Sequence, residues 1–472
     1  MKRTKIICTL GPKCRDRQTL TKMIENGMNV ARLNLSHQDH QFHAENIATL
    51  KSLRKELNVP LAILLDTKGP EIRTGCIAGG SVTLEDGATF TLTAKETVGD
   101  NTHCQVSYPR LALNLEIGDR VLIDDGKIVL RVEKIDNDDV ICKIIVGGTL
   151  SNTRGVNIPD RFIDMPFLSD KDKSDLIFGI EHGVDLVAAS FVRTANDIAE
   201  MREFLDIHGG GDIRLIAKIE NSSGIENCDA ILNIADGIMV ARGDMGVEIP
   251  FERLPGIQKR LIRNCVKSGK PAVTATQMLE TMIESNSPTR AEISDVANAV
   301  FDSTSAVMLS GETAVGHNPA HVVQVMASIC ERAEHDIFTA SNYRAPRGLE
   351  EIHNATDAVC DAAALAAEHI GAKAIIAVTL NGDTARTMSK YRPRINIIGA
   401  TDVLKTYNQL AASWGVTPLL TEPQTDTDAL FEHVAQRALE EGLISHGDTV
   451  VITAGAPVGI SGKTNLLKIT EV

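Results

Sequence analysis

Short apolar runs that end in polar residues recur along the first two thirds of the chain. Each run has the length of a buried strand, and most are followed by an amphipathic stretch with helical spacing, such as residues 195–208 and 251–268. The predicted strands are residues 5–10, 29–34, 61–67, 185–190, 214–220, 237–242, 272–276 and 306–310. Eight alternating strand and helix units predict a parallel (β/α)₈ barrel, the TIM-barrel architecture.

The third and fourth of these strands lie about 120 residues apart, whereas neighbouring strands of such a barrel are about 25–35 residues apart. From Gly69 to about Phe167 the pattern changes to short alternating runs, separated by turn pairs such as Asp86-Gly87 and Gly118-Asp119. We therefore expect a small all-β domain that is inserted after the third strand and lies on the C-terminal rim of the barrel.

The last part of the chain again alternates helices and strands. Helical stretches at 355–370, 384–390 and 427–441 are interleaved with strands at 374–379, 395–400, 416–420 and 449–453. This pattern predicts an open, doubly wound α/β sheet. The expected domains are a barrel of residues 1–69 and 168–340, an inserted all-β domain of residues 70–167, a linker of residues 341–348 and an α/β domain of residues 349–472.

Composition agrees with about three ordinary globular domains in 472 residues, because 43% of the residues are hydrophobic and 23% are charged. The net charge of −14 and an aromatic content of 3% argue against nucleic acid as a partner. No membrane span or signal peptide is expected. The nine cysteines include no CxxC pair and are expected to be buried thiols, which favours a cytoplasmic location.

The residues at the strand ends carry the candidate chemistry, because barrel active sites form there. Lys218 and Glu220 point to the same face of the fifth strand among apolar neighbours. They form either a surface ion pair or part of a buried site, and the apolar flanks favour the buried site. Glu220 and Asp244 would supply two hard oxygen ligands to Mg²⁺.

Weaker signals lie beside this pair. A short helix after Gly243-Asp244 would point free backbone N–H groups into the site, although a simple turn explains the same residues. Thr276 is a candidate for the site or a capping residue. A further group suits a monovalent cation, although the same residue types also serve as helix caps and turn formers. Its members are Asn34, Ser36, Asp66 and Thr67.

The strand-end motifs, taken in order, resemble those of the pyruvate kinase family, in particular its bacterial members, over the full chain. The segment at residues 7–12 reads Ile-Cys-Thr-Leu-Gly-Pro, and that at 65–73 reads Leu-Asp-Thr-Lys-Gly-Pro-Glu-Ile-Arg. The remaining matches are Lys-Ile-Glu-Asn at 218–221, Asp-Gly-Ile-Met-Val-Ala-Arg-Gly-Asp at 236–244, Ala-Thr-Gln-Met-Leu-Glu at 275–280 and Pro-Thr-Arg-Ala-Glu at 288–292. The barrel, a small β-barrel lid and a C-terminal effector-binding α/β domain are also implied by the resemblance.

The resemblance implies transfer of the phosphoryl group of phosphoenolpyruvate to ADP, giving pyruvate and ATP. It implies that Lys218 and Arg32 hold the phosphoryl group, that Glu220 and Asp244 bind Mg²⁺ or Mn²⁺, and that Gly243, Asp244 and Thr276 bind the substrate carboxylate. Two further sets follow from it in the same way. They are nucleotide contacts at Asn34, His37, Arg73 and Arg154, and a K⁺ site at Asn34, Ser36, Asp66 and Thr67, with Glu71 as the acidic residue of K⁺-dependent members.

A phosphorylated small-molecule effector and a homotetramer are also implied. The expected effector residues are Thr379, Asn381, Gly382, Thr384 and Lys463. Asp383 replaces a basic residue of many members, and we expect it to disfavour a second phosphate. Gln38 and Arg154 also depart from the family pattern, where Gly and Lys are usual.

Two other functions remain open from the residues alone. A metal-dependent pyruvate aldolase or lyase would use the same carboxylates without a lid or a nucleotide. A non-catalytic metabolite sensor would share the fold but not the chemistry.

Overall fold

The computed structural model describes residues 2–159, 161, 163–340, 354–459 and 462–472. Eight parallel strands close into a barrel in the order β1-β2-β3-β13-β14-β15-β16-β17, and β17 pairs again with β1. Their bounds are β1 Lys5–Thr9, β2 Val30–Asn34, β3 Ala62–Asp66, β13 Leu186–Ala189, β14 Arg214–Ile219, β15 Gly237–Ala241, β16 Ala272–Ala275 and β17 Ala306–Leu309. The predicted barrel is confirmed, because every one of these strands is an apolar run buried between the barrel interior and the outer helices.

Helices surround the barrel, and polar caps begin many of them. They are α1 Arg17–Glu25, α2 His40–Leu57, α3 Asp170–Glu181, α4 Ala195–Ile207, α5 Ser222–Glu226, α6 Cys228–Ile234, α7 Arg242–Glu248, α8 Leu254–Lys267, α9 Arg290–Phe301, α10 Gly311–Ala314 and α11 Pro319–Thr339. The helix expected at 251–268 is interrupted. A 3₁₀ turn, Phe251–Arg253, precedes α8, since Pro255 in the first turn of α8 favours a new helix start there.

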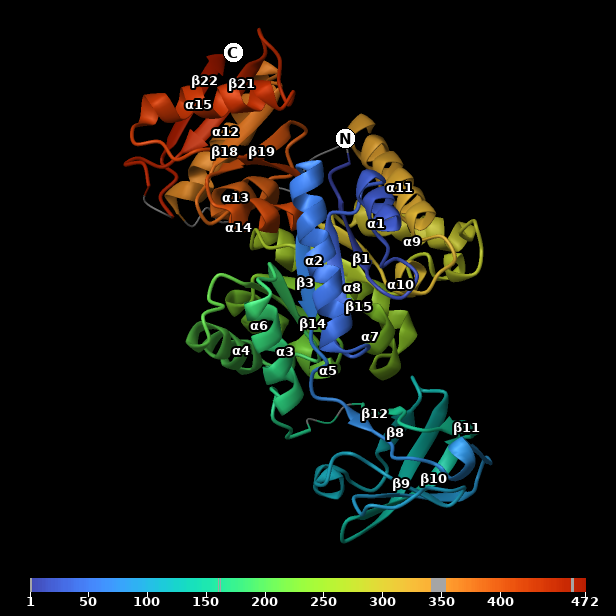
Figure 1. The fold of residues 1–472 in the computed structure, drawn as a ribbon. Helices are drawn as coiled ribbons and strands as arrows, with labels where there is room; N and C mark the ends of the chain where they lie inside the picture. Colours follow the sequence, from blue (N-terminus) through green and yellow to red (C-terminus); the bar gives the residue numbers. More distant parts are fainter. Residues whose placement is uncertain (1, 160, 162, 341–353, 460–461) are drawn as a thin grey trace.

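Strands β4 to β12, inserted between β3 and α3, form the lid, which lies below the barrel in Figure 1. Its mixed sheet has the order β4-β12-β8-β9-β10-β6-β7, and β5 pairs separately with β11. Their bounds are β4 Ile72–Arg73, β5 Ser81–Leu84, β6 Thr89–Thr93, β7 His103–Gln105, β8 Arg120–Ile123, β9 Ile128–Asp136, β10 Asp139–Val146, β11 Gly148–Ser151 and β12 Gly155–Asn157. Phe90, Leu130 and Val140 belong to a core of its own.

The C-terminal part lies at the opposite end of the barrel from the lid (Figure 1). Its sheet has the order β20-β19-β18-β21-β22. The strands are β18 Ala374–Val378, β19 Asn396–Thr401, β20 Val416–Leu420, β21 Thr449–Ala454 and β22 Leu466–Glu471, and the helices are α12 Ala355–Ile370, α13 Asp383–Lys390, α14 Leu404–Gln409 and α15 Thr427–Glu440. Helices α12 and α13 cover one face and α15 the other, so the sheet is doubly wound as expected.

The antiparallel edge strand β22 was not predicted, because Lys468 and Thr470 interrupt its apolar residues. Eight of the nine free cysteines are buried, but Cys76 is exposed on the lid. The predicted linker at 341–348 lies outside the described residues. In the described part of the chain, no helix is both long and apolar enough to cross a membrane.

Candidate active site

Four charged side chains meet at the carboxyl ends of β2, β3 and β14. The Nζ atom of Lys218 lies 3.0 Å from Oε1 of Glu220 and 3.2 Å from Oδ1 of Asp66. The other Asp66 oxygen accepts a hydrogen bond of 2.6 Å from Nε of Arg32. All four side chains are buried, so the predicted Lys218–Glu220 pair is a buried pair and not a surface ion pair.

Within this cluster, Lys218 and Asp66 each stabilise the charged form of the other. Burial by itself would lower the pKa of Lys218, but Asp66 and Glu220 outweigh burial and raise the pKa. Burial would raise the pKa of Asp66, but Arg32 and Lys218 outweigh it and lower the pKa. An ammonium and a guanidinium held on one buried carboxylate are suited to bind a phosphoryl group and to stabilise charge that develops during its transfer.

Sequence reasoning missed Ser190, which follows β13 and connects this cluster. Its hydroxyl accepts a hydrogen bond of 2.7 Å from Lys218 and donates to Asp66 and to the Thr67 carbonyl. The hydroxyl of Thr9 likewise accepts from Nη1 of Arg32. A signal was present, since Ser190 ends the predicted strand 185–190 and Thr9 is the last residue but one of the predicted strand 5–10, but a neutral hydroxyl there is also typical of a turn.

Glu220 and Asp244 form an acidic site that fits a divalent cation. Oε2 of Glu220 accepts a hydrogen bond of 2.6 Å from the Phe191 backbone, and buried Oε1 has the Lys218 ammonium at 3.0 Å but accepts no hydrogen bond from the described residues. Burial raises the pKa of Glu220, Lys218 opposes the rise, and nearby Asp244 adds to it. Two carboxylates, one with a buried oxygen that accepts no hydrogen bond, are a donor set that suits Mg²⁺ or Mn²⁺.

Thr276 does not cap the segment that follows it. Instead, its Oγ1 accepts a hydrogen bond of 2.8 Å from the backbone N–H of Gly243, in the first turn of α7, and donates to the Ala275 carbonyl. Asp244 is the next residue of that turn. The expected short helix is therefore present, and Thr276, Gly243 and Asp244 lie together at its N-terminus.

The four residues expected to bind K⁺ lie at the ends of the neighbouring strands β2 and β3 or in the loops that follow them. Asn34 and Asp66 are register partners across β2 and β3. However, Oδ1 of Asn34 accepts the Ser36 N–H, and both oxygens of Asp66 are engaged by Arg32, Lys218 and Ser190. Thr67 accepts a hydrogen bond from the Ser190 backbone.

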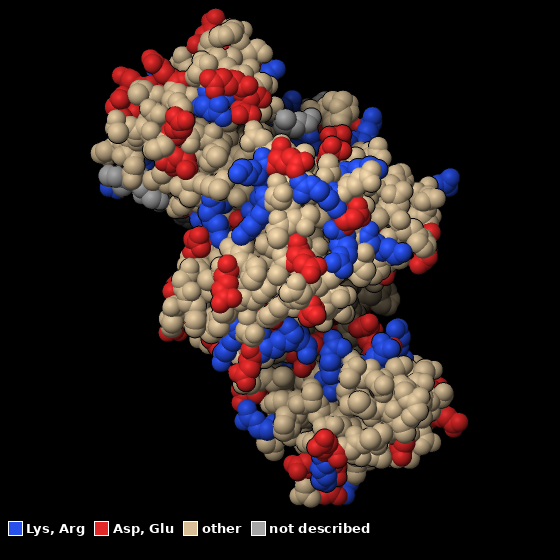
Figure 2. Space-filling model, viewed as in Figure 1, with Lys and Arg blue, Asp and Glu red and all other residues tan. Residues whose placement is uncertain are grey.

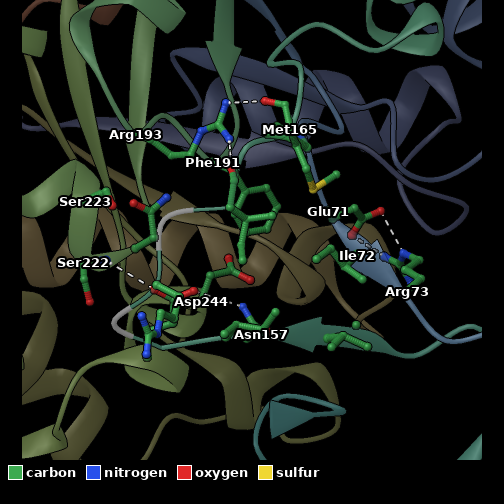
Figure 3. Close-up of a pocket in the computed structure, with 18 of the residues that line it drawn as sticks. Glu71, Ile72, Arg73, Asn157, Met165, Phe191, Arg193, Ser222, Ser223 and Asp244 are labelled. Carbon is green, nitrogen blue, oxygen red and sulfur yellow. Dashed lines mark hydrogen bonds and ion pairs between the residues drawn. The ribbon is translucent and has the colours of Figure 1, made fainter. Parts of the chain in front are cut away.

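A cleft of about 560 Å³ lies between the barrel and the lid. Figure 2 shows Lys and Arg side chains, with acidic ones among them, on both sides of this groove. In Figure 3, Asp244 and Ser222 line one side and Glu71, Ile72 and Arg73 the other. Both Arg73 nitrogens that face Glu71 lie 2.8 Å from its carboxylate.

Arg154 also lines this cleft, and its Nη1 lies 3.2 Å from Oδ1 of Asp124. His37 is exposed in the loop after β2, outside the lining of the cleft. The neighbouring Gln38 adopts φ of 65°, so this chain keeps the left-handed backbone that the usual Gly would adopt without strain.

A second cavity, of about 170 Å³, lies at the carboxyl edge of the C-terminal sheet. It brings together the predicted Thr379, Asn381, Thr384 and Lys463, whereas Gly382 is not in its lining. The Gly382 N–H donates to the Thr379 hydroxyl instead. Sequence reasoning missed Asp402, Glu422 and Thr464, which also line the cavity.

The role expected for Asp383 needs correction. Its carboxylate lies 3.0 Å from Arg386 and 3.5 Å from Arg214, and Asn381 donates to it. Asp383 does not line the cavity, so it cannot be the carboxylate that faces a second phosphate there. Asp402 and Glu422 are the acidic residues in that position, and Oδ1 of Asp402 is buried with no hydrogen-bond partner in the described chain.

Comparison with known proteins agrees with this geometry. Residues 1–323 match the model of the pyruvate kinase barrel domain, and residues 357–470 match that of the pyruvate kinase alpha/beta domain. The pyruvate kinase of Clostridium acetobutylicum is 46% identical, with both chains covered completely. That of Geobacillus stearothermophilus is 44% identical over 99% of this chain and 80% of its own length.

A crystal structure of a pyruvate kinase from Cryptosporidium parvum superposes with a TM-score of 0.93 at 37% identity. It matches 100% of this chain and 96% of its own. These relatives give no support to a pyruvate aldolase or lyase, or to a silent sensor.

Proposed function

The chain belongs to the pyruvate kinase family and transfers the phosphoryl group of phosphoenolpyruvate to ADP in glycolysis, and we propose that the Lys218–Asp66–Arg32 cluster performs this transfer. The observation that carries the proposal is the burial of two cations on one carboxylate at the strand ends. Asp66 and Ser190 fix both cations, while Nη2 of Arg32 has no hydrogen-bond partner in the described chain and is available to a phosphoryl oxygen.

The substrate carboxylate is assigned to the first turn of α7. The amides near Gly243 and Asp244 lie at the positive end of that turn, and Thr276 is tied to it by the Gly243 hydrogen bond. The nucleotide is assigned to Arg73 and Arg154 on the lid side of the cleft, together with Asn34 at the end of β2 and His37 in the loop after it, both outside the lining of the cleft. Closure of the lid excludes water from the phosphoryl group.

The family in general needs a divalent metal ion and K⁺. We assign the divalent ion, Mg²⁺ or Mn²⁺, to Glu220 and Asp244, and K⁺ to Asn34, Ser36, Asp66 and Thr67. A bound divalent ion neutralises negative charge on the phosphoryl oxygens.

The divalent site is tested by a coupled assay of pyruvate formation over a range of Mg²⁺ concentrations. Glu220→Gln is expected to raise the half-saturating Mg²⁺ concentration at least about tenfold, because it removes one of two charged ligands. Glu226→Gln, at an exposed carboxylate that also lines the cleft, is the control and should leave it unchanged. An unchanged Mg²⁺ requirement in Glu220→Gln would contradict the assignment.

The K⁺ site is tested in buffers without K⁺ or Na⁺. We expect the parent enzyme to lose most activity there and Glu71→Lys to recover part of it, because an ammonium replaces the cation's charge. Glu85→Lys, on an exposed position of the lid, serves as the control. Full parental activity without monovalent cations would rule out the site.

The C-terminal cavity is assigned to a phosphorylated small-molecule effector. The hydroxyls of Thr379 and Thr384, with Lys463, would hold its phosphate. We propose that the protein assembles as a homotetramer in the cytoplasm. The domains of each subunit would be the barrel of residues 1–69 and 168–340, the lid of residues 70–167 and the α/β domain of residues 349–472. Mass photometry of the purified protein, with and without effector, measures the assembly directly.

A further inference from the structure

Two successive residues at the end of β16 have a backbone conformation that side chains disfavour. Thr276 has φ of 67° and Gln277 has φ of 54°. A β-branched residue such as threonine rarely adopts this left-handed region, and it persists only where the surroundings hold it. Because Thr276 belongs to the proposed substrate site, whatever holds this turn also sets the direction of its hydroxyl.

The side chain of Arg242 binds three successive carbonyl groups of the turn. Its Nη2 donates to the carbonyl of Thr276 at 2.6 Å and to that of Gln277 at 3.3 Å. Its Nε donates to the carbonyl of Ala275 at 3.3 Å. The backbone N–H of the next residue, Gly243, binds the Thr276 hydroxyl at 2.8 Å. Arg242 therefore holds the backbone of Thr276, and Gly243 holds its side chain.

Arg242 is itself anchored on the side away from the turn. Its Nη1 lies 2.7 Å from Oδ1 of Asp295 on α9 and 3.5 Å from Oε1 of Gln258 on α8. The side chain is 14% exposed and does not line the cleft. A planar guanidinium is needed to reach an anchor and several carbonyls together, which a lysine ammonium cannot do.

We propose that Arg242 is a positioning residue that fixes the Thr276 hydroxyl at the substrate site without touching the substrate. This inference rests on the proposed role of Thr276. Arg242 should therefore affect kcat/KM for phosphoenolpyruvate and not KM for ADP. The turn that it holds lies at the N-terminus of α7, whereas Arg73 and Arg154, the proposed nucleotide contacts, are on the lid side of the cleft.

The test compares Arg242→Lys, Thr276→Ala and the double variant with the parent, with kcat and both KM values measured. We expect Arg242→Lys to lower kcat/KM for phosphoenolpyruvate by about 10- to 100-fold, the range for a small misplacement of a reacting group, with KM for ADP within about twofold. In the Thr276→Ala background the same change should have almost no further effect on kcat/KM, because Arg242 acts through Thr276.

Arg202→Lys is the matched control. Arg202 also binds two backbone carbonyls, of Gly211 and Ile213, and one carboxylate, of Asp236, but at the far end of the barrel. It should leave kcat/KM for phosphoenolpyruvate unchanged.

The outcomes separate the two assignments. Additive losses in the double variant, parental kcat/KM in Arg242→Lys, or an equal loss in Arg202→Lys would each overturn the role of Arg242. Parental kcat/KM in Thr276→Ala would instead overturn the proposed role of Thr276. If Arg242→Lys does not fold, Asp295→Ala keeps the arginine and removes the carboxylate that anchors it. The Asp295 variant should then show the same loss in kcat/KM for phosphoenolpyruvate, and it should cause no further loss in the Thr276→Ala background. A parental kcat/KM in this variant would overturn the proposal.

Discussion

Asp66 determines how the cations of the active site can act, because each of its oxygens is engaged by a different one. Arg32 occupies Oδ2, while Lys218 and Ser190 share Oδ1. A buried ionic network stabilises a protein only when every member is satisfied. Asp66 therefore orients Arg32 and Lys218 before any substrate binds, so that little reorganisation is needed during transfer.

Lys218→Met is expected to lower kcat by at least about 10³-fold while leaving phosphoenolpyruvate binding largely in place, because the ammonium acts chiefly on charge that develops in the transition state. The coupled assay measures kcat, and equilibrium titration measures binding. The thermal midpoint should also fall, since Asp66 and Glu220 lose their buried partner. A kcat within tenfold of the parent would contradict the role given to Lys218.

The site residues that carry a charge were predictable from the sequence, whereas the neutral groups that hydrogen-bond to them were not. Lys218, Glu220 and Asp66 are ionisable residues at the ends of apolar strands, a costly combination that signals a site. The Ser190 hydroxyl carries no such signal, because it is neutral and is also typical of a turn. The Phe191 N–H carries none either, because almost every residue has a backbone N–H. The direction of the Asp383 carboxylate was not predictable, since it depends on Arg386 in the same helix and on Arg214 from the distant strand β14.

At the scale of elements, the strands followed from the sequence because buried parallel strands are continuous apolar runs. Helix ends were less certain, as the break before α8 shows, because one proline shifts a boundary without altering the apolar spacing. Strand β22 was missed since its alternation includes Lys468 and Thr470 on its less exposed face. An edge strand gives a weaker hydrophobic signal than a central one.

The contact between β1 and β20 gives a prediction about stability and pH. Nζ of buried Lys5 donates to the Val416 carbonyl, and burial lowers the pKa of Lys5 from 10.5 to about 7. Between these values the unfolded chain binds more protons than the folded one, so the free energy of unfolding should rise with pH, by about 2 kcal/mol from pH 7 to pH 9.

Lys5→Met removes the ammonium whose proton binding differs between the folded and the unfolded chain. Its stability relative to the parent should therefore fall by about 2 kcal/mol between pH 7 and pH 9. Urea unfolding of both proteins at each pH measures the difference, and Lys22→Met, at an exposed position of α1, is the control. Parallel pH profiles for the parent and Lys5→Met would contradict the prediction.

At the scale of the whole molecule, the lid is joined to the barrel at a constrained position. Gly69 has φ of 73°, and a Cβ there would lie 2.7 Å from the Ser190 carbonyl oxygen. Its N–H donates to Asp172 of α3. This constrained turn places the junction of barrel and lid next to Ser190, whose hydroxyl contacts Lys218 and Asp66.

Replacing residues 70–167 by a short glycine-serine linker should give a soluble barrel that no longer phosphorylates ADP, because the cleft loses its lid wall and its protection from water. The barrel and the lid have separate cores, which allows such a deletion. Slow exchange of pyruvate methyl protons, followed by NMR in D₂O, should persist. Parental kinase activity in the deletion variant would show that the lid is not catalytic.

The C-terminal cavity gives a prediction about regulation. Asp402 and Glu422 line it together with Lys463, so a second phosphate would meet like charge. We expect activation by a sugar monophosphate or a nucleoside monophosphate more than by fructose 1,6-bisphosphate, through a shift between states of low and high phosphoenolpyruvate affinity. Titration of each compound at limiting phosphoenolpyruvate measures the preference.

Two variants test this cavity further. Thr384→Ala should raise the concentration needed of whichever compound activates. Asp402→Asn should bring the activating concentrations of the monophosphate and the bisphosphate closer together. Activation by the bisphosphate at far lower concentration than by any monophosphate would contradict the reading of Asp402.

Strand β14 reaches from one functional region of the protein to the other. Its first residue, Arg214, donates to the Asn381 carbonyl in the effector loop, and Lys218 lies near its other end. Six residues of strand span about 20 Å, and hydrogen bonds to β13 and β15 keep the strand straight. With the roles proposed for Asn381 and Lys218, a displacement of the loop that carries Asn381 would either break the Arg214 contact or shift β14, and with it the Lys218 ammonium.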